Sequence, residues 1–429
     1  MRFKEFELDA ERFQLRENGR PVRLERIPLE LGLLLARNPA RLVTREEIVA
    51  RIWGVNHFFE SDSAINTAMR KLRKALRDDP ARPRLIETVP GKGYRFIGQA
   101  EGNSGAPAAT SAPDPEAVRC FLRGRHAWNQ KTPRDYEAAI DWFRQAIDRD
   151  AAFAPPLVGL AYCYLTMGIH GLQPAQEVYP RARAAAQAAL EMDPHQAEAI
   201  TALAEVAKGY DLDFAQAEEG YTRALKINPD YAVAHQWYAN LLSITGRHEE
   251  AIREAQEARR CDPLSVGTTG FVGYTLYRAR RFEEALAECR RTVEFHNNAP
   301  IAAWFLALVL LTLERAEEAE AHLEHTLERS HGAGMHAALL AFARARAGRR
   351  EEARATLREL EEAAKQRYVS PVDVATVHLG LGERKRAAEM LERAIAERVM
   401  RATELPMPLY DEVRGDPRLA KFVRRLKAG

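Results

Sequence analysis

The sequence predicts a multidomain protein in which a small α+β domain precedes an all-α solenoid. Three observations indicate this. Strand-like and helix-like stretches alternate within residues 1–98, a stretch rich in Gly, Ala, Ser and Pro covers residues 99–116, and alanines then recur every 34 residues. A chain of 429 residues is long enough for several domains. We therefore expect an N-terminal domain at 1–98, a flexible linker at 99–116 and a repeat array at 117–429.

Composition and charge narrow the class of protein. Hydrophobic residues make up 46% and charged residues 29% of the chain, which is typical of a globular protein with a buried core. The net charge is only +2, yet residues 1–98 hold 20 Lys and Arg against 14 Asp and Glu. This excess favours a polyanionic partner for the N-terminal domain. The most apolar run, Ile301–Leu313, is shorter than the roughly 20 residues that a membrane-spanning helix needs. We expect a cytoplasmic, nucleoid-associated protein with no membrane contact.

The N-terminal domain is expected to contain a small sheet, three helices and a closing hairpin. "FKEFEL" and "RFQLREN" have the pattern of strands, and Asn18-Gly19 is typical of a tight hairpin turn. Helical periodicity follows in "LELGLLLARNP". Thr44 and Glu47 have the spacing of a capping box, in which each side chain bonds the other residue's backbone N–H, at the start of "REEIVARIW". After a third helix, "RLIETV" and "YRFIG" are joined by the tight turn "PGKG".

The third helix, "INTAMRKLRKAL", separates an apolar side from a basic side. Ile65, Met69, Leu72 and Leu76 form one apolar stripe, which we expect to be buried. Five cationic residues lie within eight positions off that stripe, and no acidic residue intervenes. A solvated helix face more often mixes charges, because Glu–Lys pairs four residues apart stabilise it. The helix alone therefore indicates either DNA binding or an ordinary basic surface.

The context of this helix resembles the OmpR/PhoB-type winged helix-turn-helix family. "TREEIVARIW", "INTAMRKLRKAL" and "IETVPGKGYRF" are similar to its most recognisable segments, in the same order and spacing. The resemblance implies that the third helix enters the major groove of double-stranded DNA and that the hairpin forms a wing. It also implies that Arg and Lys reach guanine edges and that Asn pairs with adenine. The expected DNA-binding residues are Asn66, Thr67, Arg70, Lys71, Arg73, Lys74, Arg77, Thr88, Lys92 and Arg95.

Two further expectations come from the same resemblance. Some members carry Arg where this chain has Pro90, so Lys92 is expected to replace that contact. The loop Gly54–Glu60 corresponds to a segment that contacts RNA polymerase in several members, which makes Phe58 and Phe59 candidates for this contact. They could equally pack under the domain. Tyr94 and Phe96 are expected in the core.

The remainder of the chain repeats with a period of 34 residues. Small residues recur at a second offset, and large apolar residues lie between the two sets. Small residues at such offsets let two antiparallel helices approach closely. The pattern resembles the tetratricopeptide repeat, in roughly eight units with "DPRLAKFVRRLKAG" as a C-terminal capping helix. The six alanines that share one register are Ala217, Ala251, Ala285, Ala319, Ala353 and Ala387.

Together these features predict a one-component transcriptional regulator. It resembles CadC/ToxR-like regulators without their membrane-spanning helix, and because the winged helix begins at residue 3 we do not expect aspartyl phosphorylation as its input. The repeats would recognise a signal, protein or peptide, or assemble the chain into a homo-oligomer on DNA. The alternative is a tetratricopeptide scaffold whose N-terminal domain binds protein. No GxxxxGK[ST], GxSxG or HExxH motif is present, so we expect neither an enzyme nor a cofactor or metal site.

Overall fold

A computed structural model describes residues 1–3, 5–9, 14–48, 52, 61–98, 113–130, 133–327 and 334–428. Its N-terminal part opens with an antiparallel sheet in the order β1-β2-β3-β4. Asn18 and Gly19 both adopt positive φ angles, 49° and 79°, and close the β3–β4 hairpin as the sequence predicted. The strands are β1 (Arg2–Phe3), β2 (Phe6–Asp9), β3 (Gln14–Glu17) and β4 (Arg20–Val22).

Helices and a second sheet complete the N-terminal part. The second sheet has the antiparallel order β5-β7-β6. The apolar stripe of α3 is buried, with Ile65, Leu72 and Leu76 at 0% exposure, so this prediction is confirmed. Tyr94 and Phe96 are also in the core. The elements are α1 (Arg26–Ala36), β5 (Leu42–Thr44), α2 (Arg45–Ile48), α3 (Ser61–Leu76), β6 (Ile86–Val89) and β7 (Gly93–Phe96).

Two local details differ from the sequence prediction. Strand β5 was not expected; it pairs with β7, where a side chain at Gly93 would overlap the Val43 carbonyl oxygen. Half of the capping box is present, since the Thr44 hydroxyl accepts a hydrogen bond from the Glu47 backbone N–H at 3.2 Å. The second predicted bond, from the Thr44 backbone N–H to the Glu47 carboxylate, is wrong. That carboxylate accepts instead from the Arg41 guanidinium at 2.6 and 3.0 Å.

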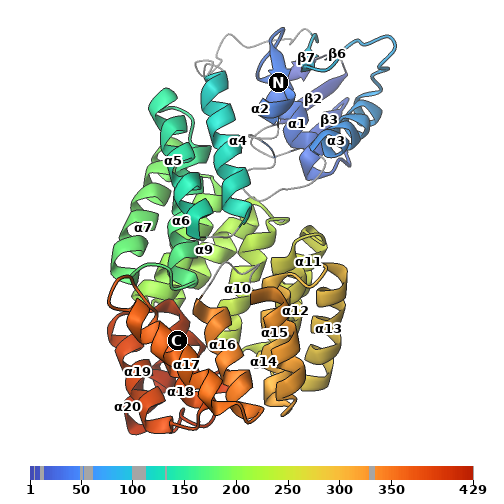
Figure 1. Cartoon of the computed structure of the whole chain (residues 1–429). Helices are drawn as coiled ribbons and strands as arrows, with labels where there is room; N and C mark the ends of the chain where they lie inside the picture. The colour runs from blue at the N-terminus through green and yellow to red at the C-terminus, as the bar shows by residue number, and fades with distance from the viewer. Residues whose placement is uncertain are drawn as a thin grey trace. The chain divides into compact units, whose positions relative to one another are not determined.

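The helical array follows from Pro115 onward as successive helix pairs (Figure 1). All six alanines of the 34-residue register are 0% exposed, as expected for small residues packed between helices. The helices are α4 (Pro115–Gln130), α5 (Pro133–Arg149), α6 (Pro155–Ile169), α7 (Ala175–Met192), α8 (Ala197–Val206), α9 (Phe214–Ile227), α10 (Ala232–Ile244), α11 (His248–Cys261), α12 (Val266–Arg278), α13 (Phe282–Phe295), α14 (Pro300–Thr312), α15 (Ala316–Leu327), α16 (Gly334–Arg346), α17 (Arg350–Ala363), α18 (Pro371–Gly380) and α19 (Arg384–Ala396).

The α-helical array contains irregular turns at two places, before and after the 34-residue register. Helix α8 continues into a π-helical turn, η2 (Ala207–Asp211), which ends at Leu212 in the left-handed region with φ 56°. After α19 the chain forms two short 3₁₀ turns, η4 (Met400–Glu404) and η5 (Pro408–Tyr410), before α20 (Pro417–Ala428). Helix α20 packs on α19, and its Leu426 also joins the buried cluster around α9 and α10. The C-terminal helix therefore contacts more than the last repeat.

Contacts divide the chain into two compact units, residues 1–125 with 142–156 and residues 126–141 with 157–429. This division runs through α4 and α5. The boundaries expected from the sequence, at 98 and 117, therefore stay a prediction; α4 begins two residues before the expected start of the repeat array. Among the described residues no helix is long and apolar enough to cross a membrane.

Candidate nucleic-acid interface

Helix α3 is held in place from beneath by its apolar side. Ala68 and Met69 are buried beside Ile65, Leu72 and Leu76, and α1 lies directly against this side. A side chain at Gly32 of α1 would come within 3.0 Å of Leu72, so the absence of a Cβ atom lets the two helices approach closely. The polar side of α3 is consequently presented outward as one surface.

Two cations of that surface are exposed and unpaired. Arg70 and Lys74 lie one helical turn apart, and within the described part of the chain neither side chain has a hydrogen-bond or ion-pair partner. Lys92, at the tip of the β6–β7 hairpin, is exposed in the same way. Thr67, in the preceding turn of α3, is half-buried. Charges without internal counter-ions keep their full attraction for an external anion.

Three other predicted cations are paired with carboxylates at the protein surface. The Lys71 ammonium lies 2.6 Å from Glu25, Arg77 lies 3.2 Å from Glu17, and Arg95 lies 2.8 Å from Glu87. Surface pairs of this kind contribute roughly 0–1 kcal/mol, so a phosphate could replace the carboxylate at small cost. They are weaker candidates than Arg70 and Lys74.

Arg73 is a correction to the predicted site. Its side chain is only 10% exposed. The guanidinium donates to the Ile86 carbonyl oxygen at 2.8 Å and to the Thr88 hydroxyl at 2.9 Å. It also lies 3.8 Å from the buried carboxylate of Asp78. Arg73 therefore joins α3 to strand β6 rather than facing outward. Because the Thr88 hydroxyl accepts from Arg73, this predicted wing residue is already engaged within the domain.

Asp78 fixes the start of the same hairpin. Its carboxylate is fully buried and accepts hydrogen bonds from the backbone N–H groups of Arg84, Leu85 and Ile86 at 2.7, 2.9 and 3.1 Å. Together with Arg73 it sets the position of the wing relative to α3. No sequence pattern indicates this role, because "RDDP" has the appearance of an ordinary helix end.

Asn66 is exposed on α3, but its carbonyl oxygen is already used. The oxygen accepts from the Arg45 guanidinium at 2.7 Å and from the Tyr94 hydroxyl at 3.1 Å. Because Arg has only donors, it fixes which end of the amide faces it, and the Asn66 NH₂ is left to point away. Arg45, at the start of α2, also lies over the Tyr94 ring at 5.6 Å. The sequence analysis did not identify Arg45 as a site residue, because it simply follows the capping residue Thr44 at the start of the predicted helix.

Phe58 and Phe59 lie outside the described residues, as does the rest of the loop Gly54–Glu60. The predicted contact with RNA polymerase is therefore left as a prediction.

Comparison with known families agrees with this geometry. Residues 19–96 match the family model described as "Transcriptional regulatory protein, C terminal", and residues 221–253 and 273–333 match two tetratricopeptide-repeat models. The chain joins an OmpR/PhoB-type DNA-binding domain to tetratricopeptide repeats. The matched families are a DNA-binding domain and a repeat, neither of them an enzyme family.

Curated relatives match this OmpR/PhoB-type domain over part of their length. The uncharacterized transcriptional regulatory protein YcbL of Bacillus subtilis is 33% identical over 96 residues, which is 22% of this chain and 42% of that protein. The sensory transduction protein RegX3 of Mycolicibacterium smegmatis is 32% identical over 91 residues, 21% and 40%. The chain thus spans about two fifths of the length of these relatives.

Two solved structures are similar to parts of this chain, at low identity and low TM-score. The DNA-binding domain of Klebsiella pneumoniae RstA, solved with its RstA box, is 24% identical, with a TM-score of 0.21; the match covers 23% of this chain and 95% of that one. Yeast Tom70 is 16% identical, with a TM-score of 0.46, covering 93% and 84%.

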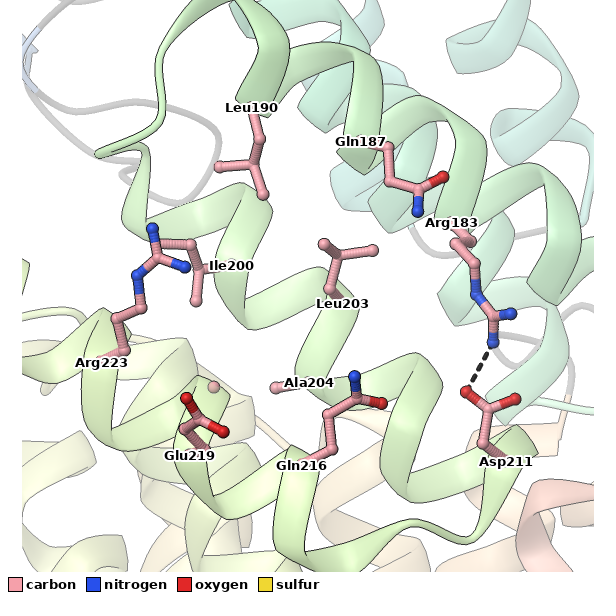
Figure 2. Close-up of a pocket in the computed structure, with 11 residues that line it drawn as sticks. Arg183, Gln187, Leu190, Ile200, Leu203, Ala204, Asp211, Gln216, Glu219 and Arg223 are labelled. Carbon is pink, nitrogen blue, oxygen red and sulfur yellow. Dashed lines mark hydrogen bonds and ion pairs between the residues drawn. The ribbon is translucent and has the colours of Figure 1, made fainter.

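One pocket lies within the array, between α7, α8 and α9 (Figure 2). Its volume is about 370 Å³, and Leu190, Ile200 and Leu203 form its apolar wall. Arg183 pairs with Asp211 at 2.5 Å on one side. Arg223 and Glu219 lie on the other side. Because its charges balance, the pocket shows no preference for an acidic or a basic ligand.

Proposed function

We propose that this protein is a sequence-specific transcriptional regulator that binds duplex DNA through α3 and the β6–β7 hairpin. The observation that supports this most directly is the outward surface of α3, where Arg70 and Lys74 are exposed without counter-ions while the opposite side is buried. Phosphate contacts from such cations supply affinity, and those that reach base edges supply specificity. DNA binding of this kind would locate the protein at the nucleoid in the cytoplasm.

The roles of individual residues follow from their surroundings. Arg70 and Lys74 are the leading candidates for base and phosphate contacts, with Lys92 reaching the backbone from the wing. Asn66 would present only its NH₂ group, so the paired adenine contact that needs both amide atoms is not available to it. A lone donor suits the acceptors of guanine or thymine in the major groove. Arg73 would act as a positioning residue.

The test is binding of the full chain to random-sequence duplex DNA over a range of salt concentrations. The Arg70→Ala/Lys74→Ala variant should bind about tenfold to 100-fold more weakly, and its log–log salt slope should be smaller by roughly one unit for each lost phosphate contact. The matched control is Arg253→Ala/Arg358→Ala, which removes two exposed arginines of the array. The control should bind as the wild type does.

Equal losses in the two variants would contradict the assignment of the site to α3. Wild-type protein that elutes from duplex DNA at low salt would favour the scaffold alternative, in which the N-terminal domain binds protein. In either function we propose that the repeats recognise a protein partner or signal. Contact with RNA polymerase and assembly into a homo-oligomer on DNA remain proposals of the same kind.

A further inference from the structure

A segment near the C-terminus runs back across the first helices of the repeat pairs. We call residues 399–414 the return segment, and the surface that it covers the receiving face. Met400 lies against Gly209 of η2, where a side chain would come within 2.7 Å of the Met400 Cγ atom. The Tyr274 hydroxyl donates to Glu404 at 3.1 Å, and the Tyr277 hydroxyl accepts from the Leu409 N–H at 3.0 Å. These partners are more than 120 residues away in sequence, so the segment bridges distant repeats.

The return segment is anchored by charge at both ends. Near its start, Arg401 donates to the buried carboxylate of Asp373 in α18 at 2.5 Å. Burial by itself lowers the pKa of Arg401, but the neighbouring carboxylates of Asp373 and Glu404 raise it above its usual range. Near its end, Asp411 pairs with Arg280 at 2.6 Å. Glu412 pairs with Arg346 at 2.6 Å and with Arg384 at 2.9 Å.

Between these anchors the return segment contributes apolar side chains in no repeat register. Leu405 is 0% exposed, and Met407 and Tyr410 are each 1% exposed. The segment forms short 3₁₀ turns in place of another helix pair. It thus meets the array as a peptide ligand would, through spaced apolar residues and charged anchors on a preformed helical surface.

The polar contacts beneath the segment are incompletely made. Arg278 of α12 is 3% exposed, yet in the described part of the chain its Nε and Nη2 atoms have no hydrogen-bond partner. Arg401 Nε and Glu404 Oε2 also lack a hydrogen-bond partner among the described residues, and form only a long ion pair with each other at 3.9 Å. A buried donor or acceptor left unpaired costs about 1–3 kcal/mol. The anchors formed by Asp411 and Glu412 are also partly exposed, and such pairs contribute little. A competing ligand with better-placed polar groups would therefore gain affinity.

We propose that the receiving face is a peptide-binding surface whose resident ligand is the return segment, and that a partner protein binds there by displacing it. The partner segment has the chemistry of the resident one: an arginine for Asp373, then spaced apolar residues, then adjacent carboxylates for Arg280, Arg346 and Arg384. The inference rests on the proposed role of the repeats in recognising a protein. It does not depend on DNA binding.

The experiment uses the full chain and a labelled synthetic peptide of residues 397–416, with fluorescence anisotropy as the readout. The variant Asp411→Ala/Glu412→Ala loses three charged anchors, so its own segment should leave the receiving face more often. Because each of these pairs contributes little, we expect it to bind the peptide about three- to tenfold more tightly than the wild type does. The matched control Glu361→Ala/Glu362→Ala removes two adjacent exposed carboxylates of α17 and should bind the peptide as the wild type does. A peptide with alanine in place of Arg401 and Tyr410 should bind neither to the wild type nor to the Asp411→Ala/Glu412→Ala variant.

Hydrogen exchange provides a second readout on the wild-type chain, in case the variant does not fold. Excess peptide should speed exchange of amides 405–414 while the α18 amides keep their protection. The proposal is overturned if the variant gains no peptide affinity, or if amides 405–414 stay as protected as α18 when the peptide is in excess. Because neither measurement contains DNA, failure of DNA binding would defeat the proposed regulator and leave this result intact.

Discussion

The central cations of α3 and several arginines of the helical array differ in how their charges are paired. In the array, arginines pair with carboxylates of the neighbouring repeat: Arg247 lies 2.7 Å from Glu218, and Arg290 lies 2.7 Å from Glu318. On α3, Arg70 and Lys74 have no such partner among the described residues. The contrast separates two kinds of basic helix that look alike in sequence. The paired arginines neutralise carboxylates of the neighbouring repeat, whereas Arg70 and Lys74 are available to bind an anionic ligand.

Buried polar groups show the reverse contrast. In the winged-helix part the Asp78 carboxylate accepts from three backbone donors and lies beside Arg73, whose Nε is the one atom of this group without a hydrogen-bond partner among the described residues. At the return segment more such atoms gather: Nε and Nη2 of Arg278 beneath it, and Nε of Arg401 and Oε2 of Glu404 within it, lack hydrogen-bond partners in the described region. The first arrangement holds a hairpin rigidly against α3. The second permits an exchange of partners. The predictions below test this contrast, beginning with the largest effect.

Replacing Asp78 should be the most damaging change to the winged-helix part. Asp78→Ala leaves three backbone N–H groups without their acceptor and Arg73 without its counter-ion in a buried site, which should cost about 3–5 kcal/mol. Hydrogen exchange of the α3 and β7 amides measures this local stability. Asp79→Ala is the matched control, because Asp79 is exposed and accepts only from the Ala81 N–H at 2.9 Å. Equal effects of the two variants would show that the buried carboxylate does not hold the hairpin.

His336 should make the array sensitive to acid. Burial lowers its pKa to about 4; the hydrogen bond to the Pro300 carbonyl opposes this shift, and Arg401 adds to it. Between pH 6.5 and 4 the unfolded chain binds a proton that the folded chain does not, so the free energy of unfolding falls as the pH falls. The loss approaches about 3 kcal/mol.

Urea denaturation over this pH range checks the His336 prediction. His336→Gln should flatten that part of the profile, whereas His195→Gln, at an exposed position, should not. An unchanged slope in the His336 variant would contradict the assignment.

Close packing of the helix pairs predicts a smaller loss at Gly273. A methyl group there would lie 2.5 Å from the Cys289 Sγ atom and 3.3 Å from its backbone nitrogen. Overpacking costs about 1–3 kcal/mol, and the gain in helix propensity offsets at most about 1 kcal/mol of it. Gly273→Ala should therefore lower the thermal midpoint of the array. Gly267→Ala, in the same helix with its nearest neighbour at 3.4 Å, should raise it or leave it unchanged.

The paired surface charges of the array should matter least. Burial raises the pKa of Glu218, but hydrogen bonds from Tyr238 and Arg247 outweigh it, so the pKa is lowered overall. The pair is nevertheless partly exposed, and Arg247→Ala should cost less than about 1 kcal/mol, with a smaller effect at high salt. The comparison variant is Arg358→Ala. A loss well above that of Arg358→Ala, unchanged by salt, would mean that these pairs do more than neutralise the surface.

Much of the fold could be predicted because its signals are local. Helical periodicity reveals the Ile65–Leu76 stripe, and the backbone preference of Asn-Gly reveals the turn at Asn18-Gly19. The alanine register is visible because it repeats at a constant spacing of 34 residues. Strand β5 was missed because three residues carry no periodicity. The return segment was missed because nothing in its sequence indicates helices more than 120 residues away.

The DNA-binding residues stay a prediction, and the structure contradicts the expected exposure of one of them, Arg73. Arg73 stands in a run of cations and looks like its neighbours, but its partners, Asp78 and the Ile86 carbonyl, come into reach only when the hairpin folds back onto α3. Glu47 shows the same limit, because Arg41 competes for the carboxylate that the capping box would use. Arg45 and its contact with Asn66 likewise required the fold.

The position of Leu426 bears on how the array comes apart. Repeat proteins ordinarily fray from their ends, since a terminal repeat has only one neighbour. Here Leu426 of α20 is buried with Tyr238 and Leu241 of α10, and the Arg398 guanidinium lies over the Tyr210 ring. The last repeats are thereby tied to earlier ones, so the usual weak end is missing. The array should melt as one cooperative block from η2 to α20, with a sharper transition than a linear stack of the same repeats.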